Sequence, residues 1–181
     1  MYYTLFNHEK NNKKFSYDLA NMILELEKPP IFLCVGSNKI VDDSLGALTG
    51  ELLSHYYKIP SKVFGNLTCP QVGNNLQNTL IKIKSEYYNN TIIVVDSSIG
   101  KLNNLYDVSL NCCSLNIDCL NSNKIVGDIS ISSVTYVKGI NDLLFQNSEK
   151  KKCVFKLANF IASGIYNALN LCENVKNSKA I

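Results

Sequence analysis

Two short apolar runs, IFLCVG at 31–36 and TIIVVD at 91–96, set the strongest limit on what this chain can fold into. Neither run alternates apolar with polar residues, which is the pattern of a strand buried on both faces. Strands of this kind belong to sheets that helices cover on both sides. The sequence therefore predicts an α/β fold, a three-layer αβα sandwich around a mostly parallel sheet.

Helical spacing of apolar residues fills the stretches between and beyond these runs. It predicts helices over 16–28, 43–58, 73–87 and 150–172, the last of them long and amphipathic. Further strands are expected at 61–66, at 105–110 on an edge of the sheet, and at 126–137. A short helical turn is expected at 140–147, a loop at 97–104 and irregular chain at 111–124. Residues 1–15 are predicted to be a loose tail, and 16–181 a single α/β domain.

Composition limits the cellular setting and the partners that we expect. The 181-residue chain carries a net charge of +3, and its lysine clusters contain no interleaved aromatic residues, so we expect no direct nucleic-acid partner. No apolar run approaches the length of a membrane span and no signal peptide is visible, so we expect a cytoplasmic protein with no membrane association. Seven cysteines without regular spacing indicate neither a disulfide framework nor a metal motif.

The stretch CVGSNKIVDDSLGALTG at 34–50 places two adjacent acids between the first apolar run and the next helix. It has one glycine where a dinucleotide-binding loop has three, and two acids would repel a phosphate at a helix N-terminus. Asp43 is well suited to cap the helix that follows. Alternatively, Asp43 is half of a pair of functional carboxylates.

Asp96 ends the second apolar run, and this placement favours the pair. Functional groups in such sheets gather beyond the carboxyl ends of the strands, so neighbouring strands would bring Asp43 and Asp96 to one crevice. The alternative for Asp96 is a carboxylate that fixes the next loop through backbone N–H groups. Two carboxyl groups within about 6 Å raise each other's pKa and share a proton, so one can activate water while the other protonates a leaving amine.

Other candidate groups accompany the pair. Gly36 and Ser37 are expected beneath the crevice, and Gly100 would let the second loop bend close, while Asp128 follows a glycine at a strand start. We assign Gly36, Ser37, Gly100 and Asp128 to substrate binding. His8 and His55 are the only histidines, and neither is expected to be catalytic. We expect no cofactor and no resident metal, although two carboxylates could hold a divalent ion if further ligands joined them.

An ordered series of motifs resembles the YyaC-type sporulation proteins over roughly residues 31–166. The series is VGSNKIVDDSLGALTG, VFGNLTCP, IIVVDSSIG, VGDISISSVTYVKG and LLFQN, followed by a C-terminal helix. That family is similar to the germination protease, which degrades small acid-soluble spore proteins, and both are similar in fold to the hydrogenase maturation proteases. The resemblance implies a phosphorylase/hydrolase-like αβα fold with catalytic aspartates at Asp43 and Asp96. The sequence departs from the family pattern at Val72, where a His is typical, at Ala47, and in the segment 114–125.

Two functions follow from the residues together with the resemblance. The first is a spore-protease-like endopeptidase that acts on sporulation or germination proteins, such as small acid-soluble spore proteins, in the cytosol of the forespore or mother cell. The second is a non-catalytic sporulation protein that binds a peptide or protein on the same fold, which the departures at Val72, Ala47 and 114–125 favour. The oligomeric state stays open, a homo-oligomer included.

Overall fold

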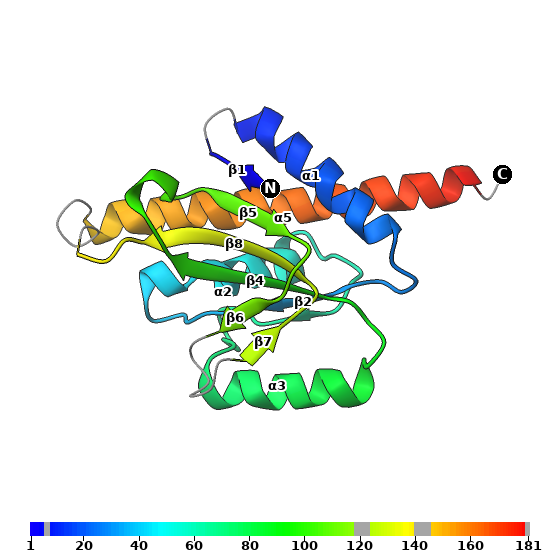
Figure 1. Ribbon diagram of the computed structural model, residues 1–181, viewed down its shortest axis with the longest axis horizontal. Coiled ribbons are helices and arrows are strands. Elements are labelled where there is room, and N and C mark those ends of the chain that lie inside the picture. The colour runs from blue at the N-terminus through cyan, green and yellow to red at the C-terminus, as the bar shows by residue number, and fades with distance from the viewer. Residues whose placement is uncertain (6–7, 118–123, 140–145, 180–181) are drawn as a thin grey trace.

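A six-stranded mixed sheet forms the centre of the molecule in a computed structural model that describes residues 1–5, 8–117, 124–139 and 146–179 (Figure 1). The strand order is β1-β5-β8-β4-β2-β3. The bounds are β1 Tyr2–Tyr3, β2 Ile31–Cys34, β3 Val63–Phe64, β4 Ile92–Ile99, β5 Val108–Asn111 and β8 Ile129–Tyr136. The pairs β2·β3, β2·β4 and β4·β8 are parallel, whereas β5·β8 and β1·β5 are antiparallel. The expected α/β class with a mostly parallel sheet is confirmed.

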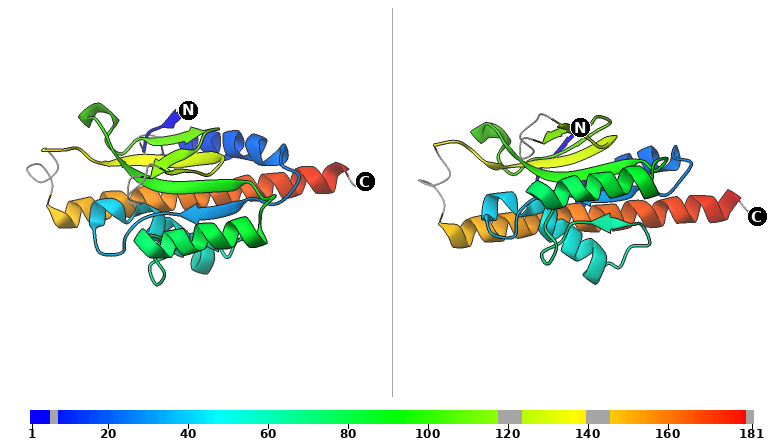
Figure 2. Two further views of the ribbon diagram at one scale, coloured as in Figure 1. Left: turned by 60° about the horizontal axis from the view of Figure 1, so that its bottom comes forward. Right: turned by 90° about the horizontal axis from the view of Figure 1, so that it is seen from below.

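Helices cover both faces of this sheet and make the three expected layers. The helices α1 (His8–Leu24), α2 (Leu45–Glu51) and α5 (Asn147–Lys179) pack on one face, around a core that includes Phe32, Ile93 and Ile131. Helix α3 (Gly73–Glu86) lies on the other face, against Leu33 and Val94. Figures 1 and 2 show α5 running along the molecule and projecting past the sheet at its C-terminal end, with α3 on the opposite side.

Alternation along the central strands explains why both faces are buried. Successive side chains of β2 and β4 point to opposite faces, so Phe32 and Leu33 enter different cores. The apolar stripe expected on the last helix is buried as predicted, and it comprises Val154, Leu157, Ala158, Ile161, Ile165 and Leu169. Among the described residues, no helix is both long and apolar enough to cross a membrane.

The N-terminal segment is structured, in contrast to the loose tail expected for residues 1–15. Helix α1 begins at His8 rather than at residue 16, and Phe15 is fully buried against the Gly164 position of α5, where a Cβ atom would lie 2.3 Å from the phenyl ring. Tyr3 in β1 is also buried, and its hydroxyl donates a 2.7 Å hydrogen bond to Asp18. Polar residues dominate residues 1–15, so the few buried apolar side chains there did not show the spacing that predicts a helix.

Several further boundaries differ from the sequence predictions. Strand β4 continues through 97–99, which was expected to be loop, and β5 lies between β1 and β8 rather than on an edge. The segment expected to be irregular forms a hairpin of β6 (Leu115–Ile117) and β7 (Lys124–Val126). The second helix begins at Leu45 and ends in a π-helical turn, η2 (Leu52–Tyr56). The helical turn expected at 140–147 lies mostly outside the described residues.

Close approach of α2 to the sheet depends on its two glycines. A Cβ atom at Gly46 would lie 1.9 Å from the carbonyl oxygen of Val35, and one at Gly50 would lie 1.8 Å from that of Gly65. No side chain fits at these distances, so glycine at both positions is required for this close packing. This contact fixes the segment immediately before α2, a 3₁₀ turn, η1 (Val41–Asp43), over the end of the sheet.

Candidate active site

The site lies where the chain leaves strand β2. Val35 still pairs with β4, because its N–H donates to the carbonyl of Val95 at 2.8 Å. Gly36 then adopts a φ of +140°, which L side chains rarely take, and a Cβ atom there would lie 2.2 Å from the carbonyl oxygen of Asp43. This bend turns the chain out of the sheet and over its carboxyl edge.

Asp43 is held by this bend and does not cap helix α2. Its Oδ2 accepts a 3.0 Å hydrogen bond from the backbone N–H of Ser37, and its Oδ1 accepts a 3.3 Å bond from the hydroxyl of Ser97. The N-cap position of α2 is Ser44, and no side chain caps the helix there. The capping interpretation is therefore wrong, and the Asp43 carboxyl turns back towards β4.

Asp96 reaches the same place from β4, which runs beside β2. Its Oδ1 accepts a 2.7 Å hydrogen bond from the backbone N–H of Ser97, the residue that also contacts Asp43. One serine thus joins both carboxyl groups, through its amide on one side and its hydroxyl on the other. Asp96 also fixes the next residue, as its alternative interpretation expected, and it lies near enough to Asp43 for that charge to raise its pKa.

The two carboxyl groups differ in their electrostatic surroundings. Burial raises the pKa of Asp96 to about 8, opposed by the Ser97 N–H and reinforced by the negative charge of Asp43. Burial also raises the pKa of Asp43 above its usual range, but the hydrogen bonds from Ser37 and Ser97 oppose the shift by stabilising the carboxylate. Burial thus favours the protonated form of Asp96, while the Ser37 and Ser97 hydrogen bonds favour the carboxylate form of Asp43.

A cavity of about 570 Å³ opens directly onto this pair. Asp42 and Asp43 form part of one wall, and Asp96 and Ser97 form part of another. The remaining lining is largely apolar, with contributions from the segment after β2, the loop before α3, β4, β6 and β8. Those residues are Val35, Gly36, Ile40, Val72, Ser98, Ile99, Leu115, Asn116, Thr135 and Tyr136.

A buried ion pair ties the η1 turn to the start of α5. The Lys150 ammonium lies 3.6 Å from Asp42 Oδ2, and the Lys150 side chain is only 5% exposed. The hydroxyl of Thr135 in β8 donates to the backbone carbonyl of Asp42. These contacts hold Asp42 beside the pair, so the lysine fixes the position of the turn that carries Asp43.

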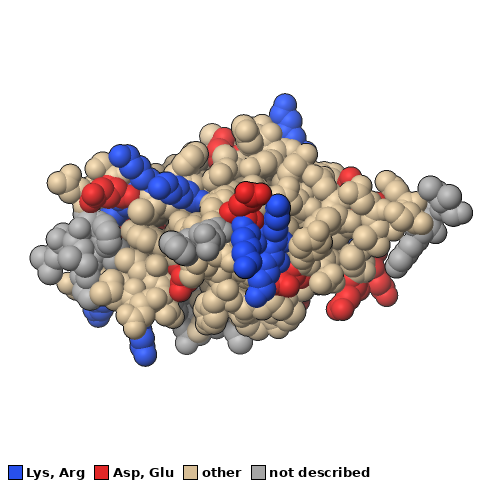
Figure 3. All heavy atoms as spheres, turned by 90° about the horizontal axis from the view of Figure 1, so that it is seen from above, with Lys and Arg blue, Asp and Glu red and all other residues tan. Residues whose placement is uncertain are grey.

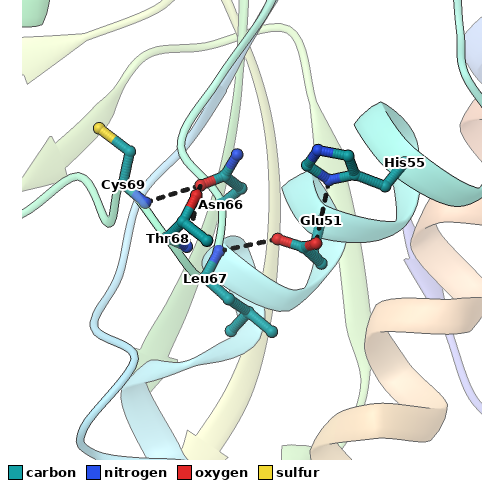
Figure 4. Close-up of polar contacts among 6 residues, drawn as sticks. All are labelled: Glu51, His55, Asn66, Leu67, Thr68 and Cys69. Atoms are coloured by element: carbon teal, nitrogen blue, oxygen red, sulfur yellow. Dashed lines mark hydrogen bonds and ion pairs between the residues drawn. The ribbon is translucent and has the colours of Figure 1, made fainter.

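A second support is the loop before α3, which stands behind Gly36. The carbonyl of Gln71 accepts a hydrogen bond from the Gly36 N–H at 3.3 Å. Figure 4 shows how this loop is anchored: Glu51 on α2 accepts the Leu67 N–H at 3.2 Å and contacts His55 at 2.9 Å. In the same loop, Asn66 Oδ1 accepts the N–H groups of Thr68 and Cys69 (Figure 4).

The structure brings only some of the candidate residues together. Asp43 and Asp96 meet at the cavity, Gly36 lines it, and Ser37 supports Asp43 through its amide. Gly100 packs against Val134 outside the cavity lining. Asp128 lies at the opposite end of β4, where its carboxylate accepts the Ile92 N–H at 2.8 Å and fixes the start of that strand.

Sequence reasoning missed Ser97, Lys150 and Thr135. Ser97 follows Asp96 directly, but residues 97–104 were expected to form a loop. The direction of the Ser97 hydroxyl could therefore not be predicted. Lys150 and Thr135 lie far from Asp42 in sequence, and only the packing of α5 and β8 brings them to it. His55 faces Glu51 with its side chain 61% exposed and takes no part in the site.

The described cavity lining does not supply the donor set of a zinc site. Zinc sites in proteins use at least three protein ligands of the His, Cys or carboxylate type. Within the described residues, no group of three such side chains is arranged to hold an ion, and Asp42 is already engaged by Lys150. Position 72, beside the pair, is a valine that offers no ligand.

Charge on the outer surface is mixed where it is visible. Figure 3 shows basic and acidic side chains next to one another on the face seen from above, with uncharged surface between such groups. On α1, the exposed side chains of Lys13 and Glu9 form an ion pair 3.0 Å apart.

The fold and site thus define an α/β protein with a carboxyl pair at the carboxyl edge of a parallel sheet. The chain belongs to the family described as "Protein of unknown function (DUF1256)", whose model matches residues 3–164. It is 24% identical over 140 residues to the uncharacterized protein YyaC of Bacillus subtilis (strain 168), covering 76% of this chain and 68% of that protein. Among solved structures, it is similar to the [NiFe] hydrogenase maturation protease HycI of Thermococcus kodakarensis KOD1. That likeness has a TM-score of 0.49 and 19% identity, over 82% of this chain and 98% of the other.

Proposed function

We propose that this protein is an endopeptidase in which Asp43 and Asp96 act as a carboxyl pair. The observation that carries the proposal is the convergence of the two groups on Ser97 at the wall of an open cavity. Structural carboxylates are usually satisfied by a cap or an ion pair, whereas Asp96 has a pKa raised to about 8, chiefly by burial. Strongly perturbed acids in a cavity are typical of catalytic sites.

The electrostatics divide the two roles. Asp43, whose carboxylate form is stabilised by the Ser37 and Ser97 hydrogen bonds, acts as the base and takes a proton from a water molecule as that water attacks the carbonyl carbon of the scissile peptide bond. Asp96, the acid whose pKa is raised to about 8 by burial, donates its proton to the leaving nitrogen as the carbon–nitrogen bond breaks. The proton taken by Asp43 then replaces the one given by Asp96, so the pair returns to its starting state after each cycle.

The substrate class comes from the motif resemblance. VGSNKIVDDSLGALTG and IIVVDSSIG, which carry Asp43 and Asp96, resemble the corresponding segments of YyaC-type sporulation proteins and, through them, of the germination protease. We propose sporulation or germination proteins as substrates, with small acid-soluble spore proteins as the first to be tried.

The test is cleavage by purified protein, followed by mass spectrometry. Wild type, Asp43→Asn and Asp96→Asn are each incubated with small acid-soluble spore proteins and with a library of blocked random decapeptides. Discrete fragments from wild type alone are expected, and Asp128→Asn serves as the matched control because Asp128 lies at the far end of β4. Equal cleavage by wild type and by either active-site variant would refute the assignment of the pair.

The second candidate is a non-catalytic protein that binds a peptide in the same cavity. The apolar lining by Ile40, Val72, Ile99 and Leu115, with no histidine at the cavity, favours it. This alternative expects saturable binding of a library peptide without any fragment, and binding that survives Asp43→Asn. Cleavage by wild type that both Asp→Asn changes abolish would remove it.

A further inference from the structure

Strand β4 extends beyond the end of its neighbour β2 at the active site. Strand β2 pairs with β4 only as far as Cys34 and Val95, with one further hydrogen bond from Val35 to the Val95 carbonyl. Beyond that point, Gly36 turns the chain away. Within the described parts of the chain, β8 is the only strand that pairs with residues 96–99 of β4. One edge of β4 is therefore unpaired for the length of this segment.

This free edge carries backbone groups that point into the cavity. Backbone groups alternate in direction along a strand, so the carbonyl of Ser97 points to the same side as that of Val95, which faces β2. Asp96, Ser97, Ser98 and Ile99 all line the cavity. Unpaired strand edges of this kind are templates for another strand.

Apolar side chains flank the free edge on both sides. Ile99 is 72% exposed at the end of β4, Leu115 comes from the β6–β7 hairpin, and Ile40 lies across the cavity on the chain that follows Gly36. Two exposed isoleucines, Ile40 and Ile99, and the partly buried Leu115 on the lining of one cavity indicate a subsite for an apolar side chain. Side chains of an added strand would alternate between this subsite and solvent.

We propose that the substrate binds as an extended peptide segment that adds to the sheet beside residues 97–99 of β4, in the place that β2 vacates at Gly36. This inference rests on the proposed peptidase function and specifies its substrate class: an unfolded segment of a protein with an apolar residue near the scissile bond. Strand addition would lay the peptide backbone across Ser97. It would therefore bring the backbone next to the Asp43 and Asp96 carboxyl groups, both of which contact that serine.

The experiment is a backbone N-methyl scan of a bound peptide. The Asp43→Asn/Asp96→Asn double variant is immobilised, blocked random decapeptides are passed over it, and the retained peptides are sequenced against a column without protein. The tightest peptide is then resynthesised with one N-methyl group at each position in turn. An added strand donates every second N–H to the sheet, so affinity should fall at least about tenfold at alternate residues and about twofold or less between them.

A substitution on the protein side checks the subsite. Ile99→Thr keeps a β-branched residue on the strand but removes apolar surface, and it should weaken peptide binding about tenfold. Ile81→Thr is the matched control, because Ile81 is 67% exposed on α3, outside the cavity lining, and its replacement should leave binding unchanged.

The outcomes separate this inference from the peptidase proposal. Alternating losses without any cleavage by wild type would support strand addition and refute the peptidase. Cleavage with N-methyl effects that do not alternate would support the peptidase and overturn strand addition. Retention of no peptide above the empty column, or equal effects of Ile99→Thr and Ile81→Thr, would also overturn it.

Discussion

Replacing Asp96 with asparagine should remove activity and at the same time stabilise the protein at alkaline pH. The pKa of Asp96 in the folded chain is about 8, against an ordinary value of 3.8, so the folded state binds this proton more tightly than the unfolded state. The free energy of unfolding of the wild type therefore falls as the pH rises from near 4 through about 8. Above that range both states have lost the proton, and no further change comes from this group.

The size of the effect follows from the same shift. Each unit of pKa difference corresponds to about 1.4 kcal/mol, and the shift spans roughly four units, so the wild type loses about 6 kcal/mol at most across this range. The true loss is smaller wherever Asp43 shares the titration. Asparagine cannot ionise, so the Asp96→Asn protein lacks this loss.

Urea unfolding followed by far-UV circular dichroism measures the difference. The free energies of the two proteins are compared at several pH values from about 4 to about 9. The stability of Asp96→Asn relative to wild type should rise steadily with pH over this range. A difference that stays constant with pH, or a variant that becomes relatively less stable at alkaline pH, would refute the assignment of Asp96 as the proton-holding partner.

Three other predictions follow from the site. Lys150→Met should lower the free energy of unfolding by about 3 kcal/mol in urea, because it leaves Asp42 buried without its cation. Adding Asp42→Asn should recover part of that loss, and full stability of the single variant would contradict the structural role of the ion pair. Gly36→Ala should lower the free energy of unfolding by at least about 2 kcal/mol and abolish cleavage. Gly139→Ala, also at positive φ but with open space around it, should lower that free energy less, and equal losses of stability would show that the contact with Asp43 is unimportant. The dependence of kcat/KM on pH should be bell-shaped, with an acid limb from Asp43 above the ordinary aspartate range and an alkaline limb from Asp96 near pH 8. Activity that keeps rising beyond about pH 9 would rule out Asp96 as the general acid.

Much of the central sheet could be predicted because its strands are continuous apolar runs. IFLCVG and TIIVVD have no alternation, and such runs fit only a sheet covered on both faces. That inference also placed Asp43 and Asp96 at one edge, since parallel neighbouring strands end together. The apolar stripe from Val154 to Leu169 on α5 could also be predicted, because a long amphipathic helix repeats the helical spacing of apolar residues several times.

The parts that escaped prediction depend on contacts between distant segments. Helix α1 begins at His8 because Phe15 and Asn12 meet α5, and Asn12 donates a 2.8 Å bond to the Phe160 carbonyl. The polar residues that continue β4 through Ser97 are typical of a loop, but their pairing with β8 keeps this segment in a strand conformation. Asp128 was assigned to substrate binding although it follows a glycine at a strand start, and the structure places it at the end of β4 away from the pair.

The most direct test of the central proposal, that Asp43 and Asp96 act as a coupled carboxyl pair at an open cavity, is a titration of the two side-chain carboxyl groups by carbon-detected NMR. One carboxyl of the pair should stay protonated to about pH 8, and its midpoint should move to lower pH in Asp43→Asn because the neighbouring charge is gone. Midpoints near the ordinary aspartate value of 3.8 for both groups, unchanged in Asp43→Asn, would contradict the claim.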